Sequence, residues 1–215
     1  MKLSLALIGW CPLACTSFST HLTATPIEPG ATEIGASVTG LVVERGAARS
    51  LLPQAELSVR HGIADGFDMG VELSALGFEL NTRHRLFAGR SLVLSLVPSA
   101  GFEVTPLTSA DSDLWMIRLG STLLLDWHLT QGTTAVFGLK PLVLLGPRPP
   151  VWSDGPAGVR VILAPGAMLG LRLPIAGAWA VFPELNLHLP WDVAERRVRT
   201  PVVQGGLGLD FRFGD

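Results

Sequence analysis

The chain has 215 residues, of which 48% are hydrophobic and 16% are charged, and its formal net charge at pH 7 is −2. A charge this close to zero gives no basic field, so we expect no nucleic-acid partner. No run of about 18 apolar residues, the length that a transmembrane helix needs, follows the N-terminus. We therefore expect the hydrophobic side chains to lie on strands.

Residues 1–14 have the features of a signal peptide: one N-terminal lysine, the apolar run LSLALIGW, and small residues before Cys15. The stretch Pro12-Leu13-Ala14-Cys15 resembles the lipobox of bacterial lipoproteins, although Pro12 stands where that family usually has leucine. The resemblance implies cleavage before Cys15 and lipidation at Cys15. A plain secretory signal and an uncleaved N-terminus are the alternatives.

Residues 16–30, TSFSTHLTATPIEPG, are polar, rich in threonine and interrupted by two prolines. This composition is typical of a linker. We expect residues 15–30 to form a lipidated N-terminus and a polar tether, followed by one domain over residues 31–213.

From residue 31 onward, apolar and polar residues alternate. In QAELSVRHG, residues 54–62, the side chains of Ala55, Leu57 and Val59 alternate with polar neighbours. A period of two indicates strands rather than helices. We predict ten strands, with eight as the alternative, over about residues 31–43, 54–62, 67–75, 77–87, 92–104, 113–128, 133–146, 157–173, 178–190 and 200–213.

The connections between these strands differ in length in a regular way. Four are long, over residues 44–53, 105–112, 147–156 and 191–199. The others are short, over residues 63–66, 88–91, 129–132 and 174–177, with a tight turn near Leu76. If the strands run up and down, all long loops lie at one end, and both termini lie at the short-turn end. This asymmetry resembles that of bacterial outer-membrane barrels.

Two predicted strands carry tryptophans at both limits of their apolar face. Trp115 and Trp127 are twelve positions apart on one strand, as are Trp179 and Trp191 on another. This separation spans on the order of 30 Å along a membrane normal. We predict that these four side chains form an aromatic girdle. Chance placement is the alternative, since the chain has no tyrosine, which is common in such belts.

The last predicted strand, GGLGLDFRF, alternates and ends on Phe213, as the C-terminal signal of outer-membrane barrels does, although Gly214 and Asp215 follow it. The resemblance implies an all-β, antiparallel up-and-down transmembrane β-barrel in the outer membrane of a Gram-negative bacterium. It also implies two partners, membrane lipid and the barrel-assembly machinery. A soluble periplasmic barrel that binds a hydrophobic ligand is an alternative, and it would invert the two faces of every strand.

The alternation directs nearly equal numbers of acidic and basic side chains inward, which predicts mutual pairing in a narrow lumen. The predicted lumen charge network comprises Glu56, Arg60, Glu72, Glu79, Arg83, Arg85, Arg118, Asp126, Lys140, Arg160, Arg172, Glu184, Asp210 and Arg212. The same pattern also directs Glu33, Asp68 and Glu103 inward. The network would either fill the barrel with side chains or line a narrow channel.

The sequence contains no HExxH, GxSxG or P-loop motif and no spaced set of metal-ligating cysteines and histidines. His128 shares a strand face with Asp126, and His188 with Glu184, but simple polar alternation produces the same spacing. Ser121 falls on the lipid-facing side. We therefore predict no catalytic, cofactor-binding or metal-binding residue, no cofactor, and no enzyme.

The predicted function is that of a structural or surface-interaction barrel. A surface ligand would bind at loops 147–156 and 191–199, where the first loop is stiffened by prolines and carries Trp152 as a candidate anchor. A narrow porin-like channel for small solutes or ions is the alternative function.

Overall fold

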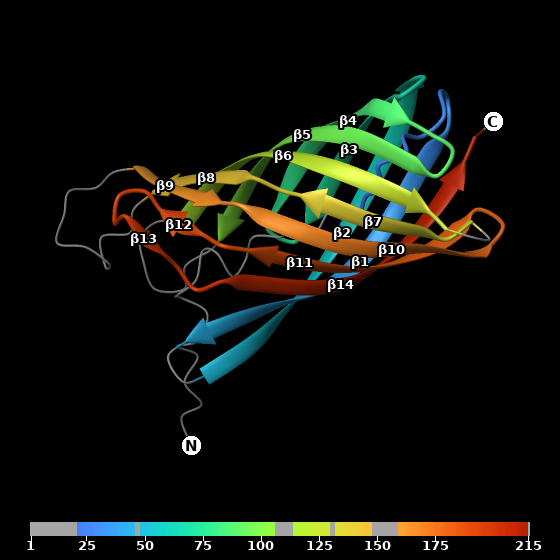
Figure 1. The fold of residues 1–215 in the computed structure, drawn as a ribbon. Coiled ribbons are helices and arrows are strands. Elements are labelled where there is room, and N and C mark those ends of the chain that lie inside the picture. The colour runs from blue at the N-terminus through green and yellow to red at the C-terminus, as the bar shows by residue number, and fades with distance from the viewer. Residues whose placement is uncertain (1–20, 46–47, 106–113, 130–131, 148–158, 215) are drawn as a thin grey trace.

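The structure is a computed structural model that describes residues 21–45, 48–105, 114–129, 132–147 and 159–214. In this part of the chain, the strands form one antiparallel sheet that closes on itself as a barrel (Figure 1). Among the described residues, no helix is long and apolar enough to cross a membrane.

The barrel wall has ten strands, as predicted, so the alternative of eight is wrong. Four of the ten are interrupted, and the wall closes where β7 pairs with β6. The strands are β1 (Thr32–Arg45), β2 (Ala48–Ala64), β3 (Phe67–Ser74), β4 (Gly77–Ala88), β5 (Leu92–Thr105), β6 (Leu114–His128), β7 (Thr134–Leu139), β8 (Leu142–Pro147), β9 (Val159–Ala164), β10 (Gly166–Ala176), β11 (Trp179–His188), β12 (Trp191–Asp192), β13 (Arg197–Val198) and β14 (Val202–Phe213).

The four interruptions fall at prolines, because proline has no backbone N–H to give to the ladder. Pro141 separates β7 from β8, Pro165 separates β9 from β10, Pro190 separates β11 from β12, and Pro201 lies between β13 and β14. Hydrogen bonds from Lys140 N to Gly166 O (2.8 Å) and from Leu189 N to Pro165 O (2.9 Å) carry the wall across the first three of these breaks.

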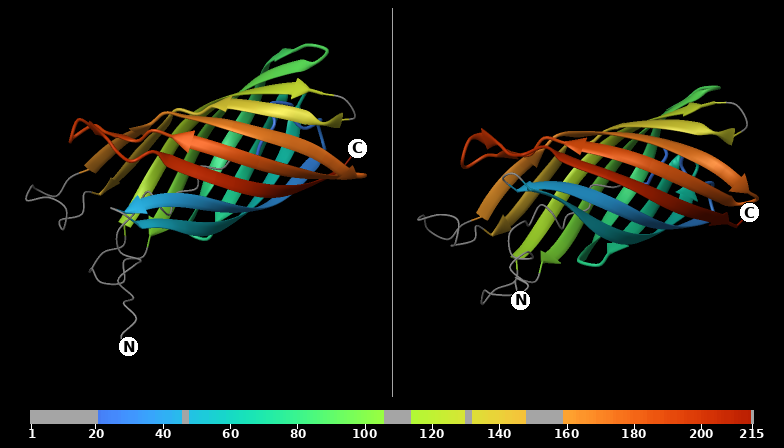
Figure 2. Two further views of the ribbon diagram at one scale, coloured as in Figure 1. Left: turned by 60° about the horizontal axis from the view of Figure 1, so that its bottom comes forward. Right: turned by 90° about the horizontal axis from the view of Figure 1, so that it is seen from below.

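The predicted long loop 44–53 is wrong for most of its length. β1 and β2 stay paired as far as Arg45 opposite Ala48 and project as a two-stranded hairpin from the end opposite the C-terminus (Figures 1 and 2). Pro53 is tolerated because β2 begins to pair with β3 only at Glu56, so the missing N–H faces no partner strand. The predicted loop 191–199 likewise contains the small β12–β13 hairpin.

The end of the barrel opposite the β1–β2 hairpin carries the short turns. Gly66 (φ 74°) and Gly177 (φ 55°) occupy the left-handed conformation that turns between β2 and β3 and between β10 and β11 require. β1 begins and β14 finishes at this same end, where Thr32 pairs with Phe213. We call it the short-turn end.

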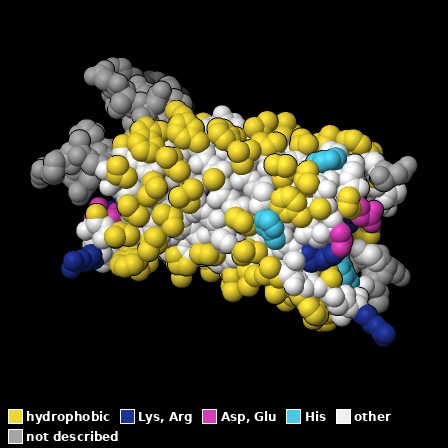
Figure 3. Space-filling view, turned by 90° about the horizontal axis from the view of Figure 1, so that it is seen from above, with side chains coloured by type: hydrophobic (Ala, Val, Ile, Leu, Met, Phe, Trp, Pro, Cys, Tyr) yellow, Lys and Arg dark blue, Asp and Glu magenta, His cyan; other side chains and the backbone are white. Residues whose placement is uncertain are grey.

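The two faces of the wall differ in polarity. Leu119 is 44% exposed and Leu185 is 52% exposed on the outside, whereas Arg118, Asp126 and Glu184 are buried inside. On the face seen in Figure 3, hydrophobic side chains are spread over the middle of the barrel, and charged side chains appear only toward its two ends. The faces are therefore assigned as in a membrane barrel and are the inverse of those in a soluble calyx.

Candidate functional site

The segment of residues 21–31, which we call the plug segment, lies inside the barrel. Leu22, Ala24, Ile27 and Ala31 are all buried, with Ala24 fully inaccessible. We expected residues 16–30 to be a tether, but the described part of that stretch is instead enclosed by the wall. The described chain begins with His21 inside the lumen and leads to the start of β1 at the short-turn end.

Luminal carboxylates bind the plug segment through its backbone N–H groups. His21 N donates to Glu184 (2.7 Å), and Ile27 N donates to Asp68 (2.8 Å). Asp126 accepts from the backbone N–H of Ala24 (2.6 Å) and of Thr25 (2.8 Å), and from the Thr25 hydroxyl (2.7 Å). These carboxylates supply the acceptors that a neighbouring strand would otherwise supply.

Two carbonyl groups of the plug segment also have wall partners. The Arg83 guanidinium donates to Thr23 O (2.6 Å), and the Ser95 hydroxyl donates to Ala24 O. Pro26 and Pro29 remove two N–H groups from this stretch, so it cannot form a regular ladder. Side chains of the wall therefore hold it in place.

An apolar cluster anchors the same segment from the other side of the lumen. Leu22 and Ala24 pack into a group of buried side chains from β5, β6, β7, β10 and β11, which are Val93, Val97, Leu124, Val136, Met168 and Phe182. Strands β5, β6, β7, β10 and β11 thus supply the buried apolar side chains that contact the plug segment.

Three glycines give the plug segment room to approach the wall. A Cβ at Gly62 would lie 2.0 Å from Glu28 O, and Gly62 exchanges backbone hydrogen bonds with Gly30 and Ala31. On β14, a Cβ at Gly208 would lie 2.8 Å from His21 Nδ1, and one at Gly206 would lie 3.2 Å from His21 Nε2. A larger residue at Gly62 would displace backbone, which is far less adaptable than a side chain.

Inward-facing side chains of the wall form two buried clusters of charged groups in the lumen. In the first, Asp68 is paired with both Arg60 and Arg83, and Arg60 also donates to Asn81. In the second, Arg118 pairs with Glu79 (2.8 Å) and Glu103 (3.4 Å). Buried Glu72 and Lys140 lie within electrostatic range of Arg118.

Four further members of the predicted network lie in three places. Asp126 and Glu184 bind the plug segment, as described above. Arg212 pairs with Glu33 (2.9 Å) near the short-turn end, and Arg160 pairs with Asp192 at the opposite end.

Arg85 is not part of the buried network. It is exposed and pairs with Asp65 in the turn between β2 and β3 (2.5 Å). Its strand position does face inward, since it lies opposite buried Ser95, but this position is at the short-turn end beside the β2–β3 turn, where the side chain reaches solvent.

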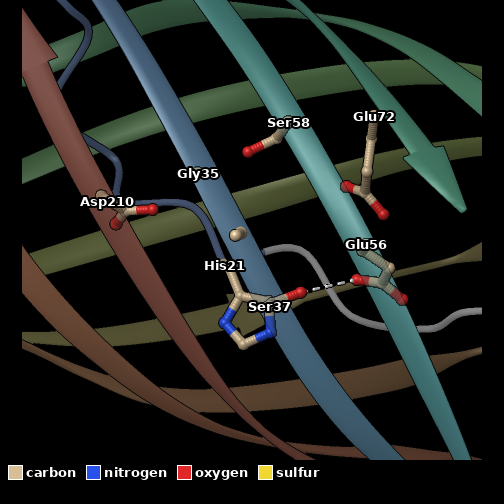
Figure 4. Close-up of a pocket in the computed structure, with 8 residues that line it drawn as sticks. His21, Gly35, Ser37, Glu56, Ser58, Glu72 and Asp210 are labelled. Carbon is tan, nitrogen blue, oxygen red and sulfur yellow. Dashed lines mark hydrogen bonds between the residues drawn. The ribbon is translucent and has the colours of Figure 1, made fainter.

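His21 also borders a small cavity between the plug segment and the wall, where Glu56, Glu72 and Asp210 converge (Figure 4). Its volume of about 10 Å³ is close to that of one water probe. The Ser37 hydroxyl donates to Glu56 (3.1 Å), and the His21 ring stands edge-on to Phe182 at 5.8 Å. Glu56, Glu72 and Asp210 of the predicted network therefore meet beside the plug segment.

A second cavity of about 200 Å³ lies against the plug segment toward the short-turn end. Thr23 and Thr25 form part of its lining, together with Asp126, His128, Gly132, Thr134, Arg172 and Arg212. The plug segment therefore leaves free space beside it in this part of the lumen.

At the end opposite the short turns, Asp192 fixes the β12–β13 hairpin. Its carboxylate accepts from Arg160 (2.7 Å), Arg199 (2.8 Å) and the backbone N–H groups of Ala194 and Glu195 (both 3.1 Å). Burial alone would raise the pKa of Asp192, but the hydrogen bonds from Arg199, Glu195 N and Arg160 outweigh it and lower the pKa to about 2.

The four girdle tryptophans lie on the outer surface. Trp115, Trp127, Trp179 and Trp191 are between 37% and 50% exposed, and the Trp179 ring lies 4.7 Å from that of Phe211. Cys15 and Trp152 lie outside the described residues, as does most of loop 147–156.

Among the described residues, no group of three or more His, Cys, Asp or Glu side chains is placed to hold a metal ion. Ser121 lies on a strand position that faces outward between exposed Leu119 and Leu123.

Sequence analysis missed two features of this site. The first is the burial of the plug segment, whose polar, proline-containing sequence is typical of a linker. The second is Asp192, which lay in a stretch we predicted to be a loop. In both cases the partners that bury the residue are distant in sequence, as with Ala24 and Asp126, which are 102 positions apart.

No protein-family model matches the chain, and no curated protein matches it. Similar solved structures include Neisserial surface protein A, which is 10% identical with a TM-score of 0.43; the match covers 86% of this chain and 99% of that chain. The translocator domain of the autotransporter NalP from Neisseria meningitidis is 15% identical with a TM-score of 0.46, over 87% of this chain and 90% of that one. The attachment invasion locus protein Ail of Yersinia pestis is 13% identical with a TM-score of 0.33, over 86% and 99%. Because these identities and TM-scores are low, we conclude nothing from the likeness, and we assign the fold from the strand pairing of the chain itself.

Proposed function

We propose that this protein is an outer-membrane barrel of a Gram-negative bacterium that is closed by its own plug segment and acts as a structural or surface-interaction protein. The observation that carries the proposal is the occupied lumen, in which Asp68, Asp126 and Glu184 bind the backbone of the plug segment. The apolar outer wall supports the membrane location, because charged side chains are strongly disfavoured on a lipid-facing strand.

Planar-bilayer recording of the purified full-length protein tests the closed state. We expect the wild-type protein to insert without steady conductance. Steady conductance whose ion preference changes in Arg118→Glu would contradict the closed state and favour the alternative function, a narrow channel. Fractionation tests the location, since extraction of the protein from cells without detergent would contradict a membrane barrel.

We further propose that cleavage precedes Cys15, that Cys15 is acylated, and that both termini are periplasmic. The lipobox-like stretch Pro12-Leu13-Ala14-Cys15 and the position of Phe213 at the short-turn end support this part of the proposal. Membrane lipid and the barrel-assembly machinery would be its partners in the outer membrane. Labelled fatty acid should enter the wild-type protein and not Cys15→Ser, and labelling that persists in the variant would contradict acylation at Cys15.

A surface ligand would bind at the end opposite the short turns, on loops 147–156 and 191–199. The β12–β13 hairpin supports this location because Asp192 holds it rigidly while Val193 and Val198 stay exposed (39% and 67%). Rigid apolar positions reduce the entropy cost of binding. Val198→Asp should abolish binding of host or bacterial surface ligands to cells that display the protein, whereas Arg197→Lys, an exposed neighbour, should leave binding unchanged.

A further inference from the structure

Most of the hydrogen bonds that hold the plug segment are made by its main chain. Its backbone N–H groups at positions 21, 24, 25 and 27 and its carbonyls at positions 23 and 24 bind side chains of the wall. No β ladder joins residues 21–27 to a strand in the described part of the chain. Main-chain hydrogen bonds combined with side-chain pockets are the way in which proteins bind extended peptides.

We propose that the lumen contains a binding site for an extended peptide, that residues 21–27 of this chain occupy it in the resting protein, and that their displacement opens a pore. The inference rests on the closed barrel proposed above and adds that the plug segment occupies a peptide-binding site that it can leave. It also defines the ligand as a short extended segment with N–H groups at the spacing of residues 21, 24, 25 and 27.

The surroundings of Ala24 make the site selective for the side chain of its ligand, in addition to binding its main chain. Its side chain is fully buried in the apolar cluster beside Leu124 and Val136. Its N–H faces Asp126, and its carbonyl accepts from Ser95. A small apolar residue with a free N–H is therefore required at this point of the ligand.

The strand pairing of the wall depends little on the plug segment. Its ten strands pair with one another all the way round, and the plug segment contributes to that pairing only where Gly30 and Ala31 meet Gly62. The cavity of about 200 Å³ already lies against Thr23 and Thr25, so departure of residues 21–27 would enlarge an existing space. The barrel is therefore expected to remain closed as a sheet when the plug segment leaves.

The test uses the full-length protein in planar bilayers with two variants. Ala24→Glu puts a carboxylate into the apolar cluster and beside Asp126, which should expel the plug segment and convert a silent barrel to one with steady conductance steps. Asp126→Asn is the conservative variant, and it should produce brief openings while leaving the wall intact. Ala176→Glu is the matched control, because it makes the same change at an exposed residue of the short-turn end and should stay silent.

A synthetic peptide of residues 21–31 then supplies the ligand from outside. It should close the pores of Ala24→Glu, whereas the same peptide carrying A24P should leave them open because proline lacks the N–H that Asp126 accepts. A variant counts as folded if it resists unfolding in detergent at room temperature and loses this resistance on heating. If Ala24→Glu does not fold, the conductance of Asp126→Asn in planar bilayers tests the proposal.

The possible outcomes separate the two proposals. A silent wild-type protein, conducting variants and closure by the peptide support both. Folded variants that stay silent would overturn the peptide site as a gate while leaving the closed barrel standing. A wild-type protein that conducts as strongly as Ala24→Glu would overturn the closed barrel itself.

Discussion

Asp126→Asn should loosen the plug segment without weakening the wall, because all of the hydrogen bonds described for Asp126 go to Ala24 and Thr25. An asparagine keeps one acceptor oxygen and presents an NH₂ group to the remaining donors, so about two charge-assisted hydrogen bonds are lost. At about 1.5–3 kcal/mol each, the loss is about 3–6 kcal/mol in the free energy of seating the segment. This corresponds to roughly a 10²–10⁴-fold larger population of the unseated state.

Hydrogen exchange of the Ala24 and Thr25 amides in detergent micelles measures this population. We expect both amides to exchange faster in Asp126→Asn by about the factor given above. The matched control is Glu79→Gln, which makes the same chemical change in the Arg118 cluster, away from the plug segment. Protection of the two amides that is equal in Asp126→Asn and in the wild-type protein would refute the reasoning.

Three further changes test other parts of the structure. Asp68→Asn leaves Arg60 and Arg83 buried without their carboxylate and should cost about 3–5 kcal/mol in the free energy of unfolding, measured by urea titration in lipid vesicles; an unchanged midpoint would contradict the buried cluster. Leu123→Arg should cost about 2–4 kcal/mol in a bilayer and reduce insertion relative to Leu123→Ala, and equal insertion of the two variants would contradict a lipid-facing position. Because the pKa of Asp192 is lowered to about 2 from an ordinary 3.8, its contribution to the stability of the β12–β13 hairpin is complete above pH 3.8 and disappears as the pH falls through about 2. A carboxyl titration followed by NMR should have its midpoint near pH 2, and a midpoint at the ordinary value would contradict the contacts of Asp192.

The strands and their faces were predictable because a half-buried strand repeats every two residues. Alternation in strands such as β6 and β11 placed Arg118 and Glu184 inside and Leu119 and Leu185 outside, as the structure has them. Alternation does not show where a strand leaves the lumen, so it did not predict that Arg85, opposite buried Ser95, is exposed beside the β2–β3 turn. It also missed the start of β2, since residues 48–53 were predicted to be part of a loop.

The occupied lumen was not predictable in the same way. The plug segment has the composition of a linker, and its burial depends on Asp68, Asp126 and Glu184, which belong to three different strands. Alternation indicated that these carboxylates face inward, and it suggested that they pair with inward cations. For Asp126 and Glu184, the described hydrogen bonds go instead to backbone N–H groups, to the Thr25 hydroxyl in the case of Asp126, and to Asn186 in the case of Glu184. Only closure of the barrel brings these groups together.

The most direct test of the occupied lumen is a methyl NOE spectrum of the full-length protein in detergent micelles, with Ala, Leu and Val methyl groups labelled. The structure places the methyl groups of Leu22 and Ala24 in one cluster with those of Leu124 and Val136. We predict cross-peaks between the two sets, and we predict that they weaken in Ala24→Glu. A spectrum in which the wall methyl groups contact one another but neither Leu22 nor Ala24 would contradict the account.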